Sequence, residues 1–442
     1  MFDEPDENER RNMRPGDDSE ENKKWQQEMV WPYAQGEEVG KVKEMYEQLA
    51  DDFKDVPQYP EVTGEYRMVR FLRGFNRDVD GAVKAVRNML AIRKEYNMDE
   101  IREKYGDCDV WDLEEHKDTK DLHTKVMQYM PIHNVGFNEQ GHLIQYHPLG
   151  DHNLKAFVKD VGLEDGEFLK YSVIAQSIRM KTMNDQTEKM GSLCKLVVVI
   201  DFMGVGLSNV RYKPMREFQK QHMNRLQNIQ ANHSGRIFLI NTPWWMKTFW
   251  KTIDKWIPEN TKRKLFLLGK NYRDELLEVL SVHTLQKLLE LRQSDSSGND
   301  KEGEVKIPKG KEMEKVVLLK PGQTVKWTFD VADKGGIDFS VSMYKREEGS
   351  TGMEKQTLVD TERFKVDDGE IEGDYTLDEE DDSDADEGKK GNNSSNDGMI
   401  SLKWSNSFSW SRSKTINFKI EIEGEEDDDE EDNNGGGSKT KK

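Results

Sequence analysis

The feature that most constrains the fold is an alternation of short apolar runs with longer amphipathic stretches between residues 121 and 292. The apolar runs are residues 142–146 (HLIQY), 196–200 (LVVVI), 237–240 (IFLI) and 265–268 (LFLL). Helical periodicity marks the stretches 167–182, 212–230, 244–257 and 273–291. Strands that alternate with helices at this spacing predict βαβ units and a largely parallel sheet, so we expect an α/β domain here.

The segments before this region have a different pattern of polar and apolar residues. Residues 1–24 are polar and charged without a helical stripe, and we predict that they are disordered. From about residue 41 to residue 110 the apolar positions recur near the helical period, with a break around Gly74 and Asn76. This part is expected to be a small helical bundle.

The pattern of polar and apolar residues changes again after the α/β region. Residues 293–310 (QSDSSGNDKEGEVKIPKG) are typical of a linker. Over residues 311–423 the apolar period becomes two, with turn residues between the runs, which predicts an antiparallel β-sandwich. An acidic surface loop is expected at residues 378–396 and an acidic disordered tail at 424–442. The fold class is therefore multidomain: a helical bundle, an α/β domain and an all-β sandwich.

The net charge of −20 is concentrated in two acidic runs. Residues 378–387 and 425–432 hold sixteen acidic side chains, and without them the net charge is −4. A nearly neutral folded part does not suit phosphate-backbone binding, so no nucleic-acid partner is expected. The longest purely apolar run, 196–200, is too short to cross a bilayer, and the two cysteines cannot form a disulfide framework. We therefore expect a cytoplasmic protein whose membrane contact is peripheral.

Motifs of catalysis and metal binding are missing from the sequence. It contains no GxSxG, HExxH, GxxxxGK[ST] or CxxC, and the pair Gly204 and Gly206 lacks the third glycine of a dinucleotide fingerprint. Histidines occur at positions 133, 142, 147 and 152, but alternation along a strand places His142 and His147 on opposite faces. We expect no catalytic residue, no metal and no cofactor other than a bound ligand.

Residues 243–264 (PWWMKTFWKTIDKWIPENTKRK) combine aromatic anchors with a basic face. The aromatic anchors are Trp244, Trp245, Phe249, Trp250 and Trp256. Three lysines at intervals of four share one helical face: Lys247, Lys251 and Lys255. This pattern favours an interfacial helix that contacts a membrane. The alternative is a core-facing helix with a solvated lysine face.

The chain resembles the CRAL-TRIO lipid-binding family over about residues 60–290. The similarity is carried by residues 66–79 (YRMVRFLRGFNRDV), 195–207 (KLVVVIDFMGVGL), 235–243 (GRIFLINTP) and 264–277 (KLFLLGKNYRDELL). Residues 311–423 resemble a GOLD domain, most clearly at 315–327 and 403–411. CRAL-TRIO followed by GOLD is the arrangement of the patellin and supernatant-protein-factor group. The resemblance implies one deep apolar cavity, a gate formed by residues 244–257, and exchange of a bound lipid at membranes.

The resemblance also implies a set of ligand positions, at which this sequence departs from the better-known members. A lysine that holds phosphatidylinositol corresponds to Lys264, but its glutamate partner corresponds to Asn232. An arginine of the N-terminal motif is replaced by Phe75. The hydroxyl residues that hold a choline headgroup correspond to Leu196 and Val198. Because unpaired polar headgroups are costly to bury, phosphatidylcholine is disfavoured. A phosphoinositide at Lys264 and a neutral isoprenoid or sterol inside the cavity are both left open.

Two functions follow from the sequence. The first is a lipid-binding and lipid-transfer protein that holds one phospholipid or small hydrophobic lipid and exchanges it at a membrane surface. The second is an adaptor or regulator of vesicle trafficking, in which GOLD and the acidic segments bind protein partners.

Overall fold

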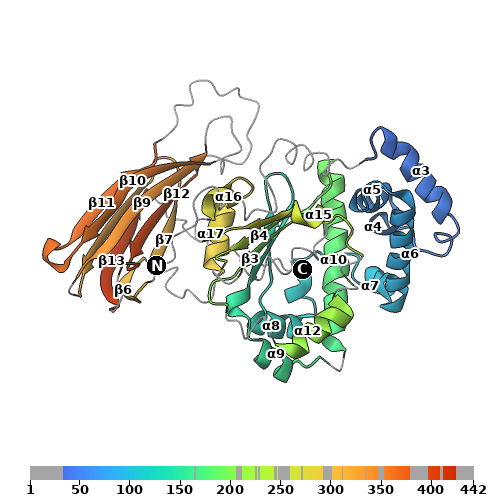
Figure 1. The fold of residues 1–442 in the computed structure, drawn as a ribbon, viewed down its shortest axis with the longest axis horizontal. Helices are drawn as coiled ribbons and strands as arrows, with labels where there is room; N and C mark the ends of the chain where they lie inside the picture. Colours follow the sequence, from blue (N-terminus) through green and yellow to red (C-terminus); the bar gives the residue numbers. More distant parts are fainter. Residues whose placement is uncertain are drawn as a thin grey trace, which may run out of the picture. The chain divides into compact units, whose positions relative to one another are not determined.

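The computed structural model describes residues 33–163, 166–205, 212–223, 226, 229–242, 246, 259–269, 272–291, 301–310, 312–333, 335–346, 353–378, 397–408 and 412–424. The chain divides into two compact units, residues 1–295 and 296–442, each with its own core. Each unit is described by itself below (Figure 1).

The first unit begins with a helical region, as the sequence predicts. Its helices are α3 (Glu37–Leu49), α4 (Pro60–Thr63), α5 (Glu65–Gly74), α6 (Val79–Glu95) and α7 (Met98–Lys104). Asp78 caps α6 by accepting a hydrogen bond from the Gly81 backbone N at 3.1 Å, which fixes where this helix begins. Apolar residues of α3, α5 and α6 form one core with Val173 and Met180, so the bundle packs onto a later helix, α10 (Glu167–Met190).

A five-stranded sheet forms the centre of the first unit, in the order β1-β2-β3-β4-β5. The strands are β1 (His133–Phe137), β2 (Leu143–Pro148), β3 (Leu196–Asp201), β4 (Ser234–Ile240) and β5 (Leu265–Leu267). Strands β2 to β5 are parallel, and β1 pairs with β2 in the antiparallel direction. The α/β architecture and the largely parallel sheet are therefore confirmed.

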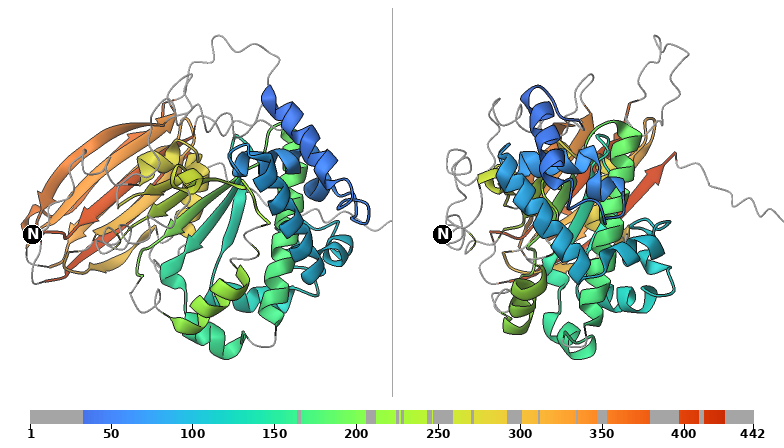
Figure 2. Two further views of the ribbon diagram at one scale, coloured as in Figure 1. Left: turned by 45° about the vertical axis from the view of Figure 1, so that its right-hand side comes forward. Right: turned by 90° about the vertical axis from the view of Figure 1, so that its right-hand side faces the viewer.

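Helices cover the sheet on both sides (Figures 1 and 2). On one side α10 packs between the bundle and the sheet, and Ile174 and Ile178 contact β3 in a shared apolar cluster. Helix α17 (Val282–Glu290) lies near β1. Its Lys287 Nζ donates a hydrogen bond to the Val135 carbonyl, with a distance of 3.0 Å between the two atoms. The remaining helices of the unit are α8 (Lys120–Tyr129), α9 (Leu154–Asp160), α12 (Lys213–Phe218), α15 (Glu259–Lys262) and α16 (Arg273–Leu277). None of the helices in the described parts is both long and apolar enough to cross a bilayer.

The second unit consists of two four-stranded antiparallel sheets, with strand orders β10-β9-β12-β7 and β11-β8-β13-β6. Their bounds are β6 (Glu302–Ile307), β7 (Glu312–Leu319), β8 (Thr324–Val331), β9 (Ile337–Arg346), β10 (Met353–Phe364), β11 (Ile371–Thr376), β12 (Gly398–Ser405) and β13 (Lys414–Glu423). Alternate residues of β7 and β8 are buried, as expected for strands with one face toward a core. Around the buried Trp404, the ring of Phe339 lies at 5.0 Å and that of Phe329 at 5.7 Å.

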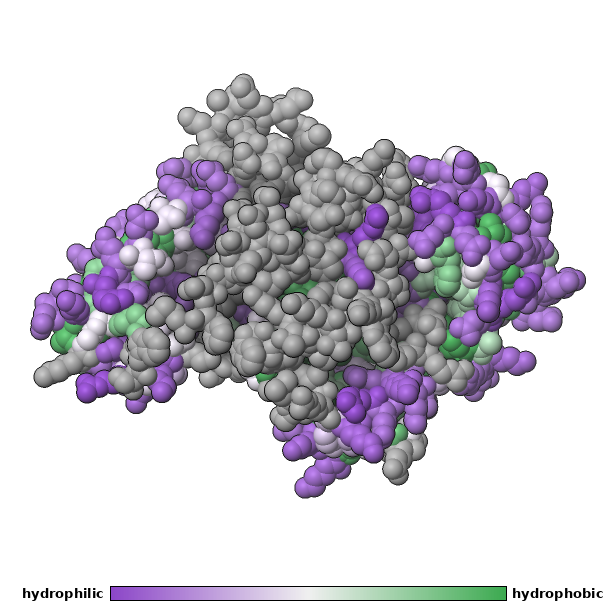
Figure 3. All heavy atoms as spheres, viewed as in Figure 1, coloured by the Kyte–Doolittle hydropathy of each residue, from purple (hydrophilic) through white to green (hydrophobic). Residues whose placement is uncertain are grey.

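On the face drawn in Figure 3, hydrophilic residues dominate the described surface of both units, and the hydrophobic spots are small. This distribution agrees with the burial of the apolar residues in the cores of the two units. The confirmed order of the chain is thus a helical region, an α/β region and an all-β region.

The structure differs from the sequence prediction in three segments. The predicted linker 293–310 contains β6, which pairs with β13 and completes a sheet. The predicted helix 273–291 is two helices, α16 and α17, because Ser281 begins a new helix by accepting a hydrogen bond from the Thr284 backbone N at 3.2 Å. The predicted helix 212–230 is an α-helix at α12 and continues as a π-helix at residues 219–223. Residues 1–24, residues 379–396 of the acidic loop and residues 425–442 of the tail lie outside the described residues.

Candidate functional site: a buried cationic cluster

Helix α5 carries two arginines into the interior of the first unit. Arg67 and Arg70 are spaced at i and i+3, which places them on one helical face, and they are only 2% and 4% exposed. The Arg70 Nη2 donates to the Cys194 carbonyl at 2.7 Å, and its Nη1 donates to the Asn232 carbonyl at 3.3 Å. Arg67 donates through Nη2 to the Ile229 carbonyl. Both arginines therefore anchor α5 to the turn that precedes β4.

Asn232 is the centre of this turn and is approached by two lysines. Its φ of 52° lies in the left-handed region, which asparagine tolerates better than most residues. The Lys195 Nζ donates to the Asn232 carbonyl at 2.8 Å, and the Lys264 Nζ donates to the Asn232 Oδ1 at 3.0 Å. Gly235 permits the close approach, because a Cβ there would lie 2.9 Å from the Lys195 Cβ. We call Arg67, Arg70, Lys195 and Lys264 the cationic cluster.

The cluster concentrates positive charge in a buried place. The acceptors of Arg70 and Lys195 are backbone carbonyls and the Thr187 hydroxyl, all of them neutral. Burial, followed by the charge of Arg70, lowers the pKa of Lys264 to about 8. The pKa of Lys195 falls well below its ordinary value because of burial and then the charges of Arg70 and Lys264. Buried lysines whose pKa is lowered by a neighbouring cation favour the approach of an anionic group.

The neighbouring Arg73 differs from the cationic cluster, because it is paired with a carboxylate. Its Nη2 lies 2.8 Å from the Glu38 Oε2, and the Arg77 Nε lies 2.8 Å from the Glu38 Oε1. Burial raises the pKa of Glu38, but the hydrogen bonds and charge of Arg73 and Arg77 outweigh it, so the pKa is lowered overall. This pair stabilises the bundle and offers no charge to a ligand.

The structure places the five predicted ligand residues at different positions relative to the cationic cluster. Lys264 and Asn232 contact each other directly, at the positions where the resemblance places a lysine–glutamate pair. The Leu196 backbone N donates to the His233 carbonyl at 2.8 Å, so β3 begins next to the cluster. Val198 lies further along β3 in the apolar cluster with α10. Phe75, at the end of α5, is 41% exposed.

The predicted gate residues lie outside the described part of the chain. They are Trp244, Trp245, Lys247, Phe249, Trp250, Lys251, Lys255 and Trp256. Within that segment the structure describes Met246, which is helical and 4% exposed.

Arg67, Arg70 and Lys195 are functional candidates that were not predicted from the sequence. The two arginines interrupt an apolar helical stripe at the i and i+3 positions, and Lys195 opens an apolar strand. A charged residue inside an apolar pattern is the signal that could have found them, because such residues are rarely buried without a purpose.

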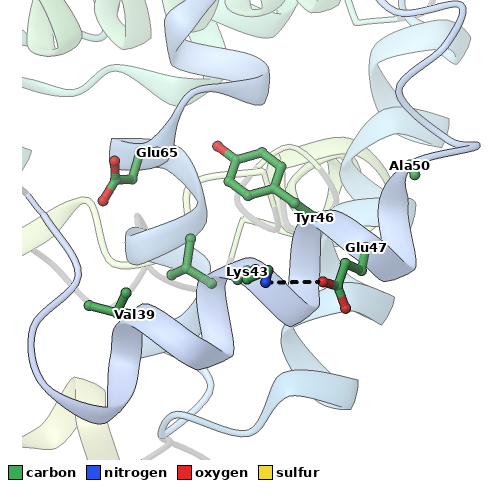
Figure 4. Close-up of a pocket in the computed structure, with 7 residues that line it drawn as sticks. Val39, Lys43, Tyr46, Glu47, Ala50 and Glu65 are labelled. Atoms are coloured by element: carbon green, nitrogen blue, oxygen red, sulfur yellow. Dashed lines mark ion pairs between the residues drawn. The ribbon is translucent and has the colours of Figure 1, made fainter.

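Two other features of the described residues do not form a ligand site. Among the described residues, no three His, Cys, Asp or Glu side chains are placed to hold a metal ion. A groove on α3 and α5 is lined by Val39, Val42, Lys43, Tyr46, Glu47, Ala50 and Glu65 (Figure 4). Its ion pair, Lys43 Nζ to Glu47 Oε1 at 3.9 Å, links two largely exposed side chains of one helix. We place no site there, because this groove lacks convergent buried polar groups.

Residues 127–290 match the profile of the CRAL/TRIO domain. The matched residues contain all five strands of the sheet in the first unit. Lys195, Asn232 and Lys264 lie inside the matched residues, and Arg67 and Arg70 come from the helical region before them. The cationic cluster is thus formed within the first unit, where the part that matches the CRAL/TRIO profile meets the preceding bundle.

Several curated proteins are similar to about half of this chain. CRAL-TRIO domain-containing protein YKL091C of Saccharomyces cerevisiae is 24% identical over 237 residues, which cover 51% of this chain and 70% of that protein. Phosphatidylinositol/phosphatidylcholine transfer protein SFH12 of Arabidopsis thaliana is 24% identical over 246 residues, 52% of this chain and 40% of that protein. SEC14 cytosolic factor of Kluyveromyces lactis is 24% identical over 239 residues, 52% of this chain and 71% of that protein. The chain therefore spans less than half the length of the Arabidopsis relative.

Among solved structures, the crystal structure of Sfh5 matches with a TM-score of 0.36 and 12% identity, covering 59% of this chain and 84% of that chain. A similarity at this score carries no argument about the site.

Proposed function

We propose that this chain is a lipid-binding and lipid-transfer protein that holds one lipid in the CRAL/TRIO domain and exchanges it at membranes. The observation that carries the proposal is the cationic cluster inside a domain of this class. Relatives of the domain include a phosphatidylinositol/phosphatidylcholine transfer protein, which supports the same function here. We infer no catalytic activity for it.

The ligand that we propose for the cluster is a lipid with an anionic phosphate headgroup, held by Lys264. Asn232 replaces the carboxylate expected beside Lys264, so the lysine charge is not neutralised by this partner. Charge-assisted hydrogen bonds to phosphate oxygens are about twice as strong as neutral ones, which would offset the cost of burying Lys264 and Lys195. Leu196 and Val198 present no hydroxyl group, so they do not favour a choline headgroup.

We propose further that residues 244–257 contact the membrane during exchange. The support is the sequence, in which four tryptophans and three regularly spaced lysines lie within this segment. Lysines near an anionic surface contribute about 1 kcal/mol each. The name cytosolic factor of the Kluyveromyces lactis relative supports a cytoplasmic location for this chain.

For the second unit we propose a GOLD domain that binds protein partners. Two antiparallel four-stranded sheets over residues 302–423 agree with the sandwich that the resemblance implies. A separate β-unit with its own core favours a role in recruiting partners, which keeps the trafficking adaptor as the second candidate function.

A vesicle assay tests the transfer function. Donor vesicles carry labelled phosphatidylinositol, acceptor vesicles carry none, and the initial transfer rate is measured for wild type, Lys264→Met and Lys94→Met. Lys94 is an exposed lysine of α6 and serves as the matched control. We expect Lys264→Met to slow transfer at least about tenfold and Lys94→Met to leave it unchanged. Wild-type protein that transfers no labelled lipid would contradict the proposal and favour the adaptor.

A further inference from the structure

The groove on α3 and α5 lacks the buried polar groups of a small-ligand site, but it presents an apolar stripe. Val39, Tyr46 and Ala50 follow one another along α3 at intervals of seven and four residues, which places them on one helical face. We call these three residues the α3 stripe. Val39 is 57% exposed, and the groove has a volume of about 520 Å³ (Figure 4). An apolar stripe along a groove is the kind of surface that the apolar face of a polypeptide segment covers.

Charged side chains border the α3 stripe. Lys43 and Glu47 come from α3, and Glu65 is the first residue of α5. The ion pair between Lys43 and Glu47 joins side chains that are 78% and 66% exposed, so it is weak. Lys43 can therefore interact with a further carboxylate that a docked segment brings.

The polypeptide enters the described part of the chain beside this groove. The Ala34 backbone N donates to the Glu65 Oε1 at 3.4 Å, and Glu65 lines the groove. The Arg73 Nη2 donates to the Tyr33 carbonyl at 3.1 Å, which holds the preceding residue against α5 as well. Residues 1–32 are therefore attached to the protein next to the N-terminal end of α3.

The residues directly before Tyr33 have the composition of a segment that binds in a groove. Half of residues 25–32 (WQQEMVWP) are apolar: Trp25, Met29, Val30 and Trp31. Trp25 and Met29 are at i and i+4, so they share one face when the segment is helical. Glu28 lies beside them and supplies a carboxylate. Tryptophan is enriched among the residues that dominate the binding energy of protein interfaces.

The length and the attachment of this segment also fit the groove. Val39 and Ala50 are about 17 Å apart along the axis of α3. Eight residues span about 12 Å as a helix and about 26 Å when extended, so residues 25–32 can cover most of the groove in either conformation. A segment joined directly to its site has an effective concentration in the millimolar range, which favours it over a separate protein.

We propose that residues 25–32 dock into the groove on α3 and α5, with Trp25 and Met29 on the α3 stripe and Glu28 near Lys43. The occupant of the groove is thus the N-terminal segment of the same chain. The inference is independent of the proposed lipid function.

Limited proteolysis of the full chain with trypsin tests the docking. Trypsin cuts after lysine and arginine and must bind an extended stretch around the cut bond. The bonds after Lys23 and Lys24 therefore report on residues 25–32, and the bond after Arg14 is an internal control. The cutting rate follows the population of the undocked state when docking is fast relative to cleavage.

The first variant is Val39→Asp, which places an unpaired charge in the α3 stripe. The fold should tolerate it, because Val39 is largely exposed and an acidic residue suits the first turn of a helix. Val366→Asp is the matched control, since Val366 is 42% exposed and belongs to the second unit. Thermal unfolding of each variant shows whether it folds.

Wild type and Val366→Asp should be cut slowly after Lys23 and Lys24, and Val39→Asp should be cut there at least about tenfold faster, because burying an unpaired charge is costly. The rate after Arg14 should be the same in all three proteins. Equal rates after Lys24 in wild type and folded Val39→Asp would overturn the inference.

A charge reversal identifies the occupant. Lys43→Glu should raise the rate after Lys24 about threefold, and the double variant Lys43→Glu with Glu28→Lys should restore the wild-type rate. Failure of Glu28→Lys to restore the rate would overturn the assignment of the groove to residues 25–32. Protection that increases with protein concentration would also overturn it, because a second copy would then occupy the groove.

Discussion

The substitution Asn232→Asp places a carboxylate inside the cationic cluster with almost no change in shape. The Asn232 Oδ1 already accepts a hydrogen bond from the Lys264 Nζ at 3.0 Å, so an aspartate oxygen would occupy the same place. Aspartate, like asparagine, tolerates the left-handed φ of 52° at this position. The change therefore alters charge and leaves the turn intact.

The size of the effect follows from the pKa of Lys264. Its folded pKa is about 8 and its ordinary value is 10.5, a gap that corresponds to about 3 kcal/mol of cost for keeping the lysine charged at pH 7. Lys264 is 9% exposed, so solvent screens this interaction little. A carboxylate partner should offset part of the cost of keeping Lys264 charged. The desolvation of the carboxylate itself reduces this gain. We expect Asn232→Asp to raise the free energy of unfolding at pH 7 by about 1 to 2 kcal/mol.

The pKa of Lys264 also determines how the free energy of unfolding changes with pH. Between pH 8 and 10.5 the folded wild type has released the Lys264 proton while the unfolded chain still holds it, so wild-type stability rises with pH over this window. In the variant the carboxylate raises the pKa of Lys264, and this rise should vanish. The stability difference between variant and wild type should therefore shrink as the pH increases from 8 to 10.5.

Urea unfolding at pH 7 and pH 10 measures both effects. Asn97→Asp is the control, because Asn97 also has a left-handed φ, of 51°, and is exposed. The control should change stability by less than about 0.5 kcal/mol. The reasoning would be refuted if Asn232→Asp were less stable than wild type at pH 7, or if both proteins gained the same stability between pH 8 and 10.

Three further predictions concern other parts of the chain. Because burial lowers the pKa of His147 to about 3, wild type should lose about 2 to 3 kcal/mol of stability between pH 7 and 4.5, and His147→Gln should lose less; equal losses in urea unfolding would argue against this. Trp404→Ala should cost about 3 to 5 kcal/mol and shift only the transition of the second unit in calorimetry, so a shift of every transition would contradict independent cores. Changing Lys247, Lys251 and Lys255 together to Glu should abolish sedimentation with anionic liposomes without changing the circular dichroism; undiminished sedimentation would remove the membrane-contact proposal.

The sequence was sufficient for elements with a clear apolar period. Strands β2 to β5 and β7 to β9 were predictable because buried residues recur in runs or at alternate positions. Strand β1 was not, because Val135 is its single buried residue and gives no period. Strands β6 and β11 are edge strands with mostly exposed residues, so their sequences resemble loops.

The candidate site was predictable only in part. The resemblance indicated that Lys264 and Asn232 belong together, and the structure shows their hydrogen bond. Arg67 and Arg70 reach the same turn from more than 150 residues away in sequence, and no local pattern reveals such a contact.

The most direct test of the central claim is extraction of the purified full-length protein with organic solvent, followed by quantitative lipid mass spectrometry. The account predicts about one lipid per chain, carrying a net negative charge, and its depletion in Lys264→Met. Protein that yields no lipid, or that yields a neutral isoprenoid or sterol unaffected by this substitution, would contradict the claim that Lys264 of the cationic cluster holds the ligand.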